Sequence, residues 1–225
     1  MRENWSDENY AAHYNRLYAT PAEEFQACLD LLALGPEDSL VDFGCGNGDF
    51  LALAADRVAS ALGVDLSGPQ LEIARTRLSG RPGVEILQST FLDFDPGARR
   101  FTRGFSRKAL HHLTDSEKEL FLARIGPAFQ PGALFLLEDG MFFGFEREEL
   151  EANWDVLVAE AQAYYGDSWE AKKPDILHSF RNEFPTGVRR WERIFEKAGF
   201  TVTERRARSS FYGTLLAVKR QGNEG

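Results

Sequence analysis

The sequence predicts an α/β fold built on one mostly parallel sheet of seven strands, with helices on both faces and an antiparallel hairpin at the C-terminal end. From residue 38 onward, short apolar runs alternate with amphipathic segments, a pattern typical of βαβ units. A glycine-rich turn at 44–48 joins the first apolar run to the next amphipathic segment. The last two apolar runs, 200–208 and 211–220, have no helical segment between them, which indicates a hairpin.

The whole chain, residues 1–225, is expected to form a single domain. A hydrophobic share of 43% and a charged share of 27% are those of an ordinary globular protein, and a chain of this length needs no division into two cores. We expect an N-terminal helical cover at 1–37, a core at 38–140, a helical insertion at 141–185, and a closing helix and hairpin at 186–219.

The first half of the chain presents helices and strands in a regular order. Ser67 is the expected N-cap of a helix whose first turn contains Pro69, a position where proline is tolerated. Glycines and prolines between the apolar runs supply the turns. The expected segments are helices at 9–18, 21–35, 49–59 and 67–79, and strands at 40–44, 60–67 and 83–90.

The second half continues the alternation as far as residue 140. A fourth strand is predicted at 99–110, with Phe101 and Phe105 as its buried positions. Thr114 and Glu117 have the spacing of a capping box at the start of the next helix. The remaining expected segments are a helix at 114–129, a fifth strand at 131–140, and, after the insertion, a helix at 186–200 that Gly199 ends.

The insertion at 141–185 breaks this alternation, because its two segments, 145–169 and 170–184, have helical spacing and many aromatic residues. An aromatic-rich insertion directly after a strand of a parallel sheet predicts a lid over a small-molecule site. Aromatic side chains at helical spacing also serve ordinary packing, so both roles are expected here. Tyr164, His178 and Arg181 are the lid residues expected to contact a substrate.

Charge and cysteine content exclude several classes of protein. The net charge is −9, and the basic clusters at 98–108 and 204–208 are short and separated, so we expect no nucleic-acid partner. No apolar run is long enough to span a bilayer, and the N-terminus lacks the apolar stretch of a signal peptide. Two cysteines, Cys28 and Cys45, cannot form a disulfide framework, which favours a cytoplasmic location.

The glycine turn at 44–48 indicates a cofactor site. A strand that ends in glycines before a helix N-terminus presents backbone N–H groups at the edge of the sheet. A dinucleotide fingerprint requires G-x-G-x-x-G, but Asp49 occupies the position of its third glycine and would oppose a pyrophosphate. A phosphate-binding P-loop is excluded as well, because no G-K-[ST] follows.

The motif D-x-G-x-G-x-G, from Asp42 to Gly48, resembles the first motif of the class I S-adenosylmethionine-dependent methyltransferases, which have a Rossmann-like fold. The resemblance extends to Asp65 at the end of the second strand, to ALHHL at 109–113, to the fifth strand and to FEKAGF at 195–200. It implies S-adenosylmethionine as cofactor and S-adenosylhomocysteine as product. The residues that it implies for the cofactor are Asp42, Gly44, Cys45, Gly46, Asn47, Gly48, Asp65, Leu66, Thr90, Phe91 and Ser106, with Tyr14 of the N-terminal helix covering them.

Two positions depart from the family pattern. Many members have an aspartate after the third strand that meets the adenine amino group, whereas this chain has Thr90 there, so Thr90 or the backbone of Phe91 is expected to hold adenine. Thr102 stands where the family often has an aspartate. Within the resemblance, Asp65 is expected to accept hydrogen bonds from both ribose hydroxyls, since a carboxylate offers two acceptor oxygens.

The expected chemistry lies at the carboxyl ends of the fourth and fifth strands. Methyl transfer requires alignment more than acid–base help, and His111 or His112 could orient or deprotonate an acceptor, or could instead cap the next helix. Glu138 and Asp139 are expected to contact the substrate or to cap the next segment. No metal is expected, because only these two carboxylates could complete a site with the histidines.

The sequence therefore predicts an S-adenosylmethionine-dependent methyltransferase that acts on oxygen, nitrogen or sulfur of a small molecule. Two alternatives remain open: a cyclase or lyase that uses the same cofactor on the same fold, and a binding module without catalysis. Neither the acceptor nor the oligomeric state follows from the sequence.

Overall fold

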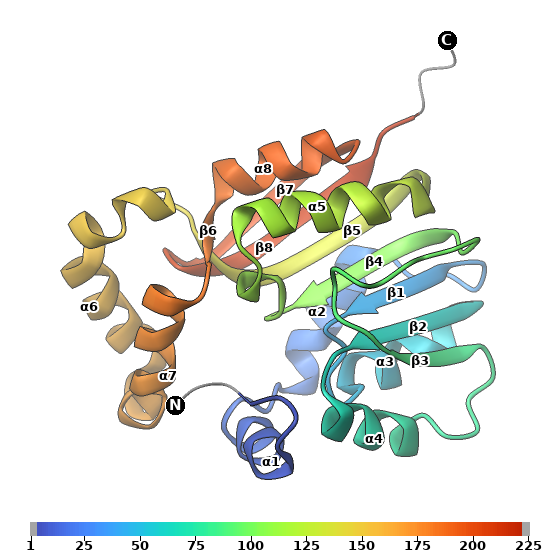
Figure 1. The fold of residues 1–225 in the computed structure, drawn as a ribbon, viewed down its shortest axis with the longest axis horizontal. Helices are drawn as coiled ribbons and strands as arrows, with labels where there is room; N and C mark the ends of the chain where they lie inside the picture. Colours follow the sequence, from blue (N-terminus) through green and yellow to red (C-terminus); the bar gives the residue numbers. More distant parts are fainter. Residues whose placement is uncertain (1–3, 222–225) are drawn as a thin grey trace.

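The computed structural model describes residues 4–221. Its sheet has the strand order β3-β2-β1-β4-β5-β8-β7, with β6 paired to β5 (Figure 1). The strands are β1 Ser39–Phe43, β2 Ser60–Asp65, β3 Val84–Gln88, β4 Phe101–Arg107, β5 Phe129–Phe142, β6 Thr186–Gly187, β7 Phe200–Ser209 and β8 Tyr212–Lys219. The α-helices are α1 Glu8–Leu17, α2 Ala22–Leu32, α3 Asp49–Ala54, α4 Gly68–Arg77, α5 Asp115–Ile125, α6 Trp154–Tyr165, α7 Trp169–Asn182 and α8 Val188–Lys197.

The predicted fold class is confirmed. Strands β1 to β5 pair with one another in parallel, and β8 runs antiparallel to both β5 and β7. The seven expected strands all form. The eighth, β6, is a two-residue strand beside the end of β5, too short to show any periodicity in the sequence.

Helices cover both faces of the sheet, with α5 and α8 on one face (Figure 1). The side chains of the strands alternate between the two faces, as the period of two requires. In β5, Phe135 and Leu137 pack in the core beneath α5 and α8, whereas Leu136 packs with residues of α2, α3 and α4 on the other face. Phe101 and Phe105 are both buried, as expected.

Polar caps fix where two of the helices begin. The hydroxyl of Ser67 accepts a hydrogen bond from the backbone N–H of Gln70, and Thr114 and Glu117 form the reciprocal bonds of a capping box. Helix α3 is shorter than predicted, because the chain tightens into a 3₁₀ turn at Ala55–Arg57. The segment after β3 forms no helix and leads directly to β4.

The predicted insertion at 141–185 is helical, and it begins after β5 ends at Phe142; residues 143–185 are called the lid here, after the role predicted for them. Its helices α6 and α7 lie beyond the end of β5, away from the helices that cover the sheet (Figure 1). They have their own apolar cluster, in which Leu157, Trp169 and Phe180 pack with Phe211 of the hairpin. Many of the lid's aromatic side chains therefore serve packing, which is one of the two roles that the sequence predicts for them.

In the part of the chain that the structure describes, none of the helices combines the length and the apolar character needed to cross a membrane.

Candidate active site

A cavity of about 630 Å³ opens at the carboxyl ends of β1, β2 and β4, and we call it the first cavity. This is the edge at which parallel α/β sheets bind ligands. Most of the residues predicted to hold a cofactor line it: Tyr14, Asp42, Gly44, Cys45, Gly46, Asn47, Asp65, Leu66, Thr90 and Phe91.

The glycine turn wraps the end of β1 in a conformation that other residues adopt rarely. Gly44 has a φ of 79°, and a Cβ at this position would lie 2.4 Å from the Cβ of Ala109. Its backbone N–H donates to the carbonyl oxygen of Val64 at the end of β2. The turn can therefore follow this path only with glycine at position 44.

Two carboxylates form part of the first cavity's wall. Asp65 accepts hydrogen bonds from the backbone N–H groups of Gly46 (2.9 Å) and Ser67 (2.8 Å), one on each oxygen. Asp42 is buried, and burial together with the charge of Asp65 raises its pKa well above the usual range. Burial also raises the pKa of Asp65, against the effect of its backbone donors. No cationic side chain of residues 4–221 forms an ion pair with either one.

Two predicted cofactor residues lie outside the lining of both cavities. Gly48 begins α3, and a Cβ there would come within 3.1 Å of Ala74, so its absence lets α3 and α4 pack closely. The hydroxyl of Ser106 is fully buried and donates to the carbonyl oxygen of Phe43. Gly48 therefore supports the site through helix packing and Ser106 through the pairing of β4 with β1, whereas both were expected to contact the cofactor.

The adenine slot predicted at Thr90 contains an acid that the sequence analysis missed. Thr90 donates its hydroxyl to Asp93 at 2.6 Å, and both residues line the first cavity. Asp93 lies three positions beyond the place where the family pattern has an aspartate. Its proximity to the cavity follows only from the turn after β3, which brings it next to Thr90. Thr102, the second departure, donates to Asp38 at the start of β1 and serves the sheet.

The N-terminal cover closes the first cavity through contacts that sequence spacing could not reveal. The side-chain amides of Asn15 in α1 and Gln70 in α4 donate to each other at 3.0 and 2.9 Å, across 55 positions of sequence. The hydroxyl of Ser67 donates to the carbonyl oxygen of Trp5. Trp5, Tyr14, Asn15 and Gln70 all line the cavity.

A second cavity of about 370 Å³ adjoins the first, between the N-terminal cover, the end of β4 and the lid. Residues that line both cavities include Tyr14, Tyr18, Arg107 and Lys108. Two predicted substrate residues, Tyr164 and His178, line the second cavity. Arg181 does not, because its guanidinium lies 3.7 Å from the ring centroid of Trp154 and pairs with Glu151 on the outer side of the lid.

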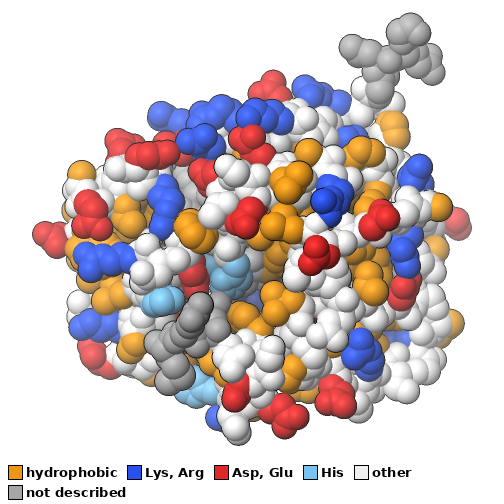
Figure 2. Space-filling view, in the orientation of Figure 1, with side chains coloured by type: hydrophobic (Ala, Val, Ile, Leu, Met, Phe, Trp, Pro, Cys, Tyr) orange, Lys and Arg blue, Asp and Glu red, His pale blue; other side chains and the backbone are white. Residues whose placement is uncertain are grey.

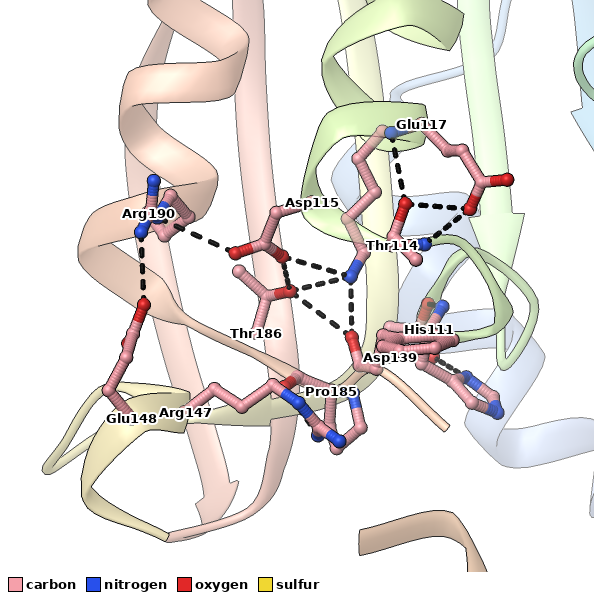
Figure 3. A network of polar contacts seen from close by, with 12 residues as sticks. His111, Thr114, Asp115, Glu117, Asp139, Arg147, Glu148, Pro185, Thr186 and Arg190 are labelled. Atoms are coloured by element: carbon pink, nitrogen blue, oxygen red, sulfur yellow. Dashed lines mark hydrogen bonds and ion pairs between the residues drawn. The ribbon is translucent and has the colours of Figure 1, made fainter. Parts of the chain in front are cut away.

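The two histidines face different cavities. His111 lines the second cavity and His112 the first. Asp139 accepts a hydrogen bond from the backbone N–H of His111 and binds its Nδ1 (Figure 3). The Nε2 atom of His111 lies 3.3 Å from a carboxylate oxygen of Glu183 in the lid. Burial alone would lower the pKa of His111, but the two carboxylates raise it to about 10. Burial and the neighbouring His111 lower the pKa of His112 to about 4.

His111, His112 and Glu183 also bring three potential metal-ligand atoms within 4.8 Å of one another. A metal ion requires His111 to be neutral. The two carboxylates beside His111 favour its protonated form, and the resulting ion pairs satisfy both ring nitrogens. The arrangement is therefore explained as an imidazolium held between carboxylates, and no metal role is assigned to it.

Glu138 and Asp139 lie behind the cavity wall, not in it. Glu138 is buried and accepts hydrogen bonds from Tyr212 (2.7 Å) and Cys28 (3.0 Å), and it pairs with Arg107. The charge of Arg107 keeps the pKa of Glu138 below its usual value in spite of burial. Both acids thus orient residues that do line the second cavity, in place of the direct substrate contact that we predicted.

A polar network around the start of α5 holds the segment 183–187, where the chain returns from the lid to the sheet (Figure 3). We call this segment the exit of the lid. The ammonium group of Lys118 is fully buried and donates to the carbonyl oxygen of Phe184 and to the hydroxyl of Thr186. The N–H of Phe184 donates to the carbonyl oxygen of His111. The end of the lid is therefore tied to the same turn that carries the two histidines.

Comparison with known proteins finds similarity to methyltransferases. Residues 40–132 match the family model described as a methyltransferase domain. An uncharacterized methyltransferase of Anoxybacillus flavithermus is 26% identical over 203 residues, which cover 89% of this chain and 88% of that protein. The matched domain and relatives of this kind identify the chain as an S-adenosylmethionine-dependent methyltransferase.

Solved structures share the methyltransferase fold at low sequence identity. Phosphoethanolamine N-methyltransferase 2 of Haemonchus contortus, in complex with S-adenosyl-L-methionine, superposes with a TM-score of 0.70 at 17% identity and covers 96% of this chain and 58% of its own. The cyclopropane synthase MmaA2 of Mycobacterium tuberculosis superposes with a TM-score of 0.63 at 20% identity, covering 86% and 67%.

The first cavity of this methyltransferase has the chemistry that S-adenosylmethionine requires. The cofactor carries an ammonium and a sulfonium group, and the buried Asp42 and the half-buried Asp65 are carboxylates without a cationic partner among the described residues. Opposite charge nearby favours the ionised form of such carboxylates. The cavity's volume also lies in the range of small-ligand sites. The first cavity therefore offers suitable groups for S-adenosylmethionine, the cofactor expected for a methyltransferase with this glycine motif.

Proposed function

We propose that this methyltransferase transfers the methyl group of S-adenosylmethionine to a small molecule held in the second cavity. The observation that carries the proposal is the wall shared by the two cavities, in which Tyr14, Tyr18 and Lys108 face both. A donor in the first cavity and an acceptor in the second would meet at this wall. Holding two reactants side by side supplies much of the rate in such a reaction.

The second cavity suits a small acceptor better than a polymer. It is bounded by the N-terminal cover and the lid, and its volume of about 370 Å³ is that of a site for a compact molecule. In the view of Figure 2, histidine side chains lie beside a hollow in the surface, whereas many Lys and Arg side chains lie along the upper edge of the molecule. Basic residues of α8 and β7, among them Arg190, Lys197 and Arg205, pair with carboxylates, which supports a solvated surface over a nucleic-acid site.

Asp42 and Asp65 are proposed to hold the cofactor through its cationic and hydroxyl groups, with Thr90, Asp93 and Phe91 around the adenine. When bound, S-adenosylmethionine supplies an electrophilic methyl group. Neither histidine has a pKa suited to a general base near neutral pH, because His111 stays protonated and His112 stays neutral. We therefore assign His112 an orienting role beside the methyl donor and His111 a role in holding Glu183 and the lid.

Calorimetry and product analysis test the proposal together. S-adenosylmethionine and S-adenosylhomocysteine are expected to bind with micromolar affinity, and S-adenosylhomocysteine is expected to form only when an acceptor from a small-molecule library is present. Absence of cofactor binding would leave the binding module without catalysis as the better description. Accumulation of methylthioadenosine without an acceptor would instead support the cyclase or lyase.

A cavity-filling variant tests the role of the second cavity. Ile176 lines only this cavity, and Ile176→Trp is expected to abolish methyl transfer while the affinity for S-adenosylhomocysteine stays within about twofold. Full activity in this variant would place the acceptor elsewhere. The two cysteines are buried and unpaired, which supports a reducing compartment, and we propose the cytoplasm as the location.

A further inference from the structure

Lys108 occupies an unusual position between the two cavities. It follows β4 with a φ of 52°, a left-handed backbone conformation that residues other than glycine adopt rarely. Such conformations are concentrated at functional sites. Its ammonium group lies 5.8 Å from the ring centroid of Tyr18 and 5.9 Å from that of Tyr212. The backbone therefore holds this lysine against the wall where donor and acceptor would meet.

A second lysine reaches the same ring from the lid. Lys172 of α7 lies 5.4 Å from the ring centroid of Tyr18 and 5.3 Å from that of Tyr165, and it lines the second cavity. Tyr18 thus contacts one ammonium group from the core and one from the lid. Cation–π contacts of this kind position a charge but do not neutralise it.

The carboxylates of the second cavity are already engaged elsewhere. Glu24 pairs with Arg107, Asp175 accepts the hydroxyl of Tyr18, and Glu183 contacts His111. Within residues 4–221, no carboxylate oxygen lies within the 4.0 Å of an ion pair from the ammonium of Lys108 or Lys172. Among the described residues, the second cavity therefore contains two ammonium groups without an ion-pair partner, and a bound anion could pair with both.

The surroundings of Lys108 change the pKa of its ammonium group. Burial, followed by the charges of Arg107 and Lys172, lowers its pKa to about 8, although Glu138 and Glu24 act in the opposite direction. Lys108 is thus partly desolvated and repelled by its neighbours, and an anion placed beside it would relieve both effects.

We propose that the acceptor carries an anionic group, a carboxylate or a phosphate, which binds between Lys108 and Lys172, while its apolar part lies along the tyrosine side chains of the second cavity. The inference rests on the proposed function and deepens it by naming the acceptor's chemistry. The anion would join a residue of the core to a residue of the lid and so favour the closed lid.

A cationic acceptor is disfavoured by the same contacts. Tyrosine rings can hold an ammonium ligand, but the rings of Tyr18, Tyr165 and Tyr212 already contact the protein's own lysines. A cationic ligand would also face the unpaired charges of Lys108 and Lys172.

Three small probes that share a phenol ring test this inference on the protein saturated with S-adenosylhomocysteine. Calorimetric titration is performed with 4-hydroxybenzoate, 4-hydroxyphenyl phosphate and the neutral 4-hydroxybenzamide. At least one anionic probe is expected to bind about tenfold more tightly than the amide, the size of one charge-assisted contact. Equal affinity for all three, or no measurable binding of any, would overturn the inference.

Variants at the two lysines locate the contact. Lys172→Gln and Lys108→Gln are each expected to reduce the preference for the anion to about threefold or less, and Lys172→Arg is expected to retain it. Lys173→Gln is the matched control, because Lys173 is adjacent on α7 but contacts Trp169 outside the lining of both cavities. An unchanged preference in both glutamine variants would also overturn the inference.

The affinity for S-adenosylhomocysteine separates the failure of this inference from that of the proposed function. If the wild-type protein binds S-adenosylhomocysteine but shows no preference for anions, only the inference fails. If it does not bind S-adenosylhomocysteine, both fail. A Lys108→Gln variant that loses affinity for S-adenosylhomocysteine and keeps the anion preference would assign Lys108 to the cofactor and overturn its role here.

Discussion

At the scale of single residues, Asp65 links the glycine turn to the first cavity. Its oxygens accept one backbone N–H each, from Gly46 and Ser67, and each retains a second acceptor position. The same carboxylate can therefore shape the turn and accept hydrogen bonds from a ligand. Asp42 is a second carboxylate in the cavity wall and is buried, whereas Asp65 is half-buried.

Asp65→Ala is expected to weaken the binding of S-adenosylmethionine by about 1.5–3 kcal/mol, since hydrogen bonds to a charged acceptor have this magnitude. Calorimetry measures the effect. Asp56→Ala is the matched control, because Asp56 is an exposed partner of Arg81 away from the cavity, and it should change the affinity little. An unchanged affinity in Asp65→Ala would show that the ribose lies elsewhere.

The pair of His111 and Asp139 predicts a pH dependence of stability. Because the pKa of folded His111 is raised to about 10, its contribution is complete below the unfolded value of about 6.5 and is lost as the pH rises through about 10. The pKa of folded Asp139 is lowered, so its contribution is present above its unfolded value of about 3.9 and is lost as the pH falls below it.

Asp139→Asn is expected to lower the free energy of unfolding at pH 7 by about 3 kcal/mol, because it leaves a largely buried imidazolium with a single carboxylate partner. Urea unfolding at pH 7 and pH 10 measures both effects. The wild-type protein should lose more stability between the two pH values than the variant does. Equal losses would contradict the assigned protonation of His111.

Local spacing was enough to predict some site residues and not others. Asp42 and Asp65 could be predicted because they match the family's motif residues at the ends of two strands, and parallel strands end at one edge of the sheet. Lys108 and Lys172 could not, because their contact depends on how the lid packs, and no periodicity in the sequence sets that. The convergence of strand ends also predicts Glu138 and Asp139 in the cavity. Their side chains instead lie behind the lining of the second cavity.

At the scale of secondary-structure elements, the lid is tied to the core where it returns to the sheet. Lys118 of α5 reaches the backbone of Phe184 and the side chain of Thr186, and β6 pairs with the end of β5. Capping residues made the start of α5 predictable, since Thr114 and Glu117 act over three positions. The two-residue strand β6 was missed because it exists only through this tertiary contact.

Lys118→Met is expected to destabilise the fold by about 2 kcal/mol and to loosen the lid's exit, because it removes a buried donor and leaves its acceptors unsatisfied. Hydrogen exchange should quicken at residues 180–187. Lys197→Met is the matched control, since Lys197 is exposed and pairs with Glu119 at the surface. Unchanged exchange in Lys118→Met would show that the lid's apolar cluster alone holds its exit.

At the scale of the whole molecule, the fold class was predictable because the alternation of strands and helices leaves few topologies. The number of strands, the length of α3 and the cavities required the structure. The N-terminal cover illustrates the reason, since α1 is positioned by side chains that meet α4 across 55 residues. Its amphipathic pattern alone could not distinguish a cover of the sheet from a cover of a site.

Cofactor binding should stabilise the whole domain. S-adenosylhomocysteine at a hundred times its Kd is expected to add about 2.7 kcal/mol, or roughly 5–10 °C in Tm for a domain of this size. Differential scanning calorimetry measures the shift. NAD is the control ligand, because Asp49 lines the first cavity where the dinucleotide fingerprint has its third glycine. A comparable shift with NAD would contradict the assignment of the glycine turn.

The shared wall of the two cavities has a consequence for the sequence of events in catalysis. Tyr18, Ala19 and Thr20 belong to the connection between α1 and α2, and they bound both cavities. An acceptor seated against this connection would hold it in place and obstruct the donor's path. We therefore expect an ordered mechanism in which the donor enters first and its demethylated product leaves last. In steady-state kinetics S-adenosylhomocysteine should then compete with S-adenosylmethionine and not with the acceptor.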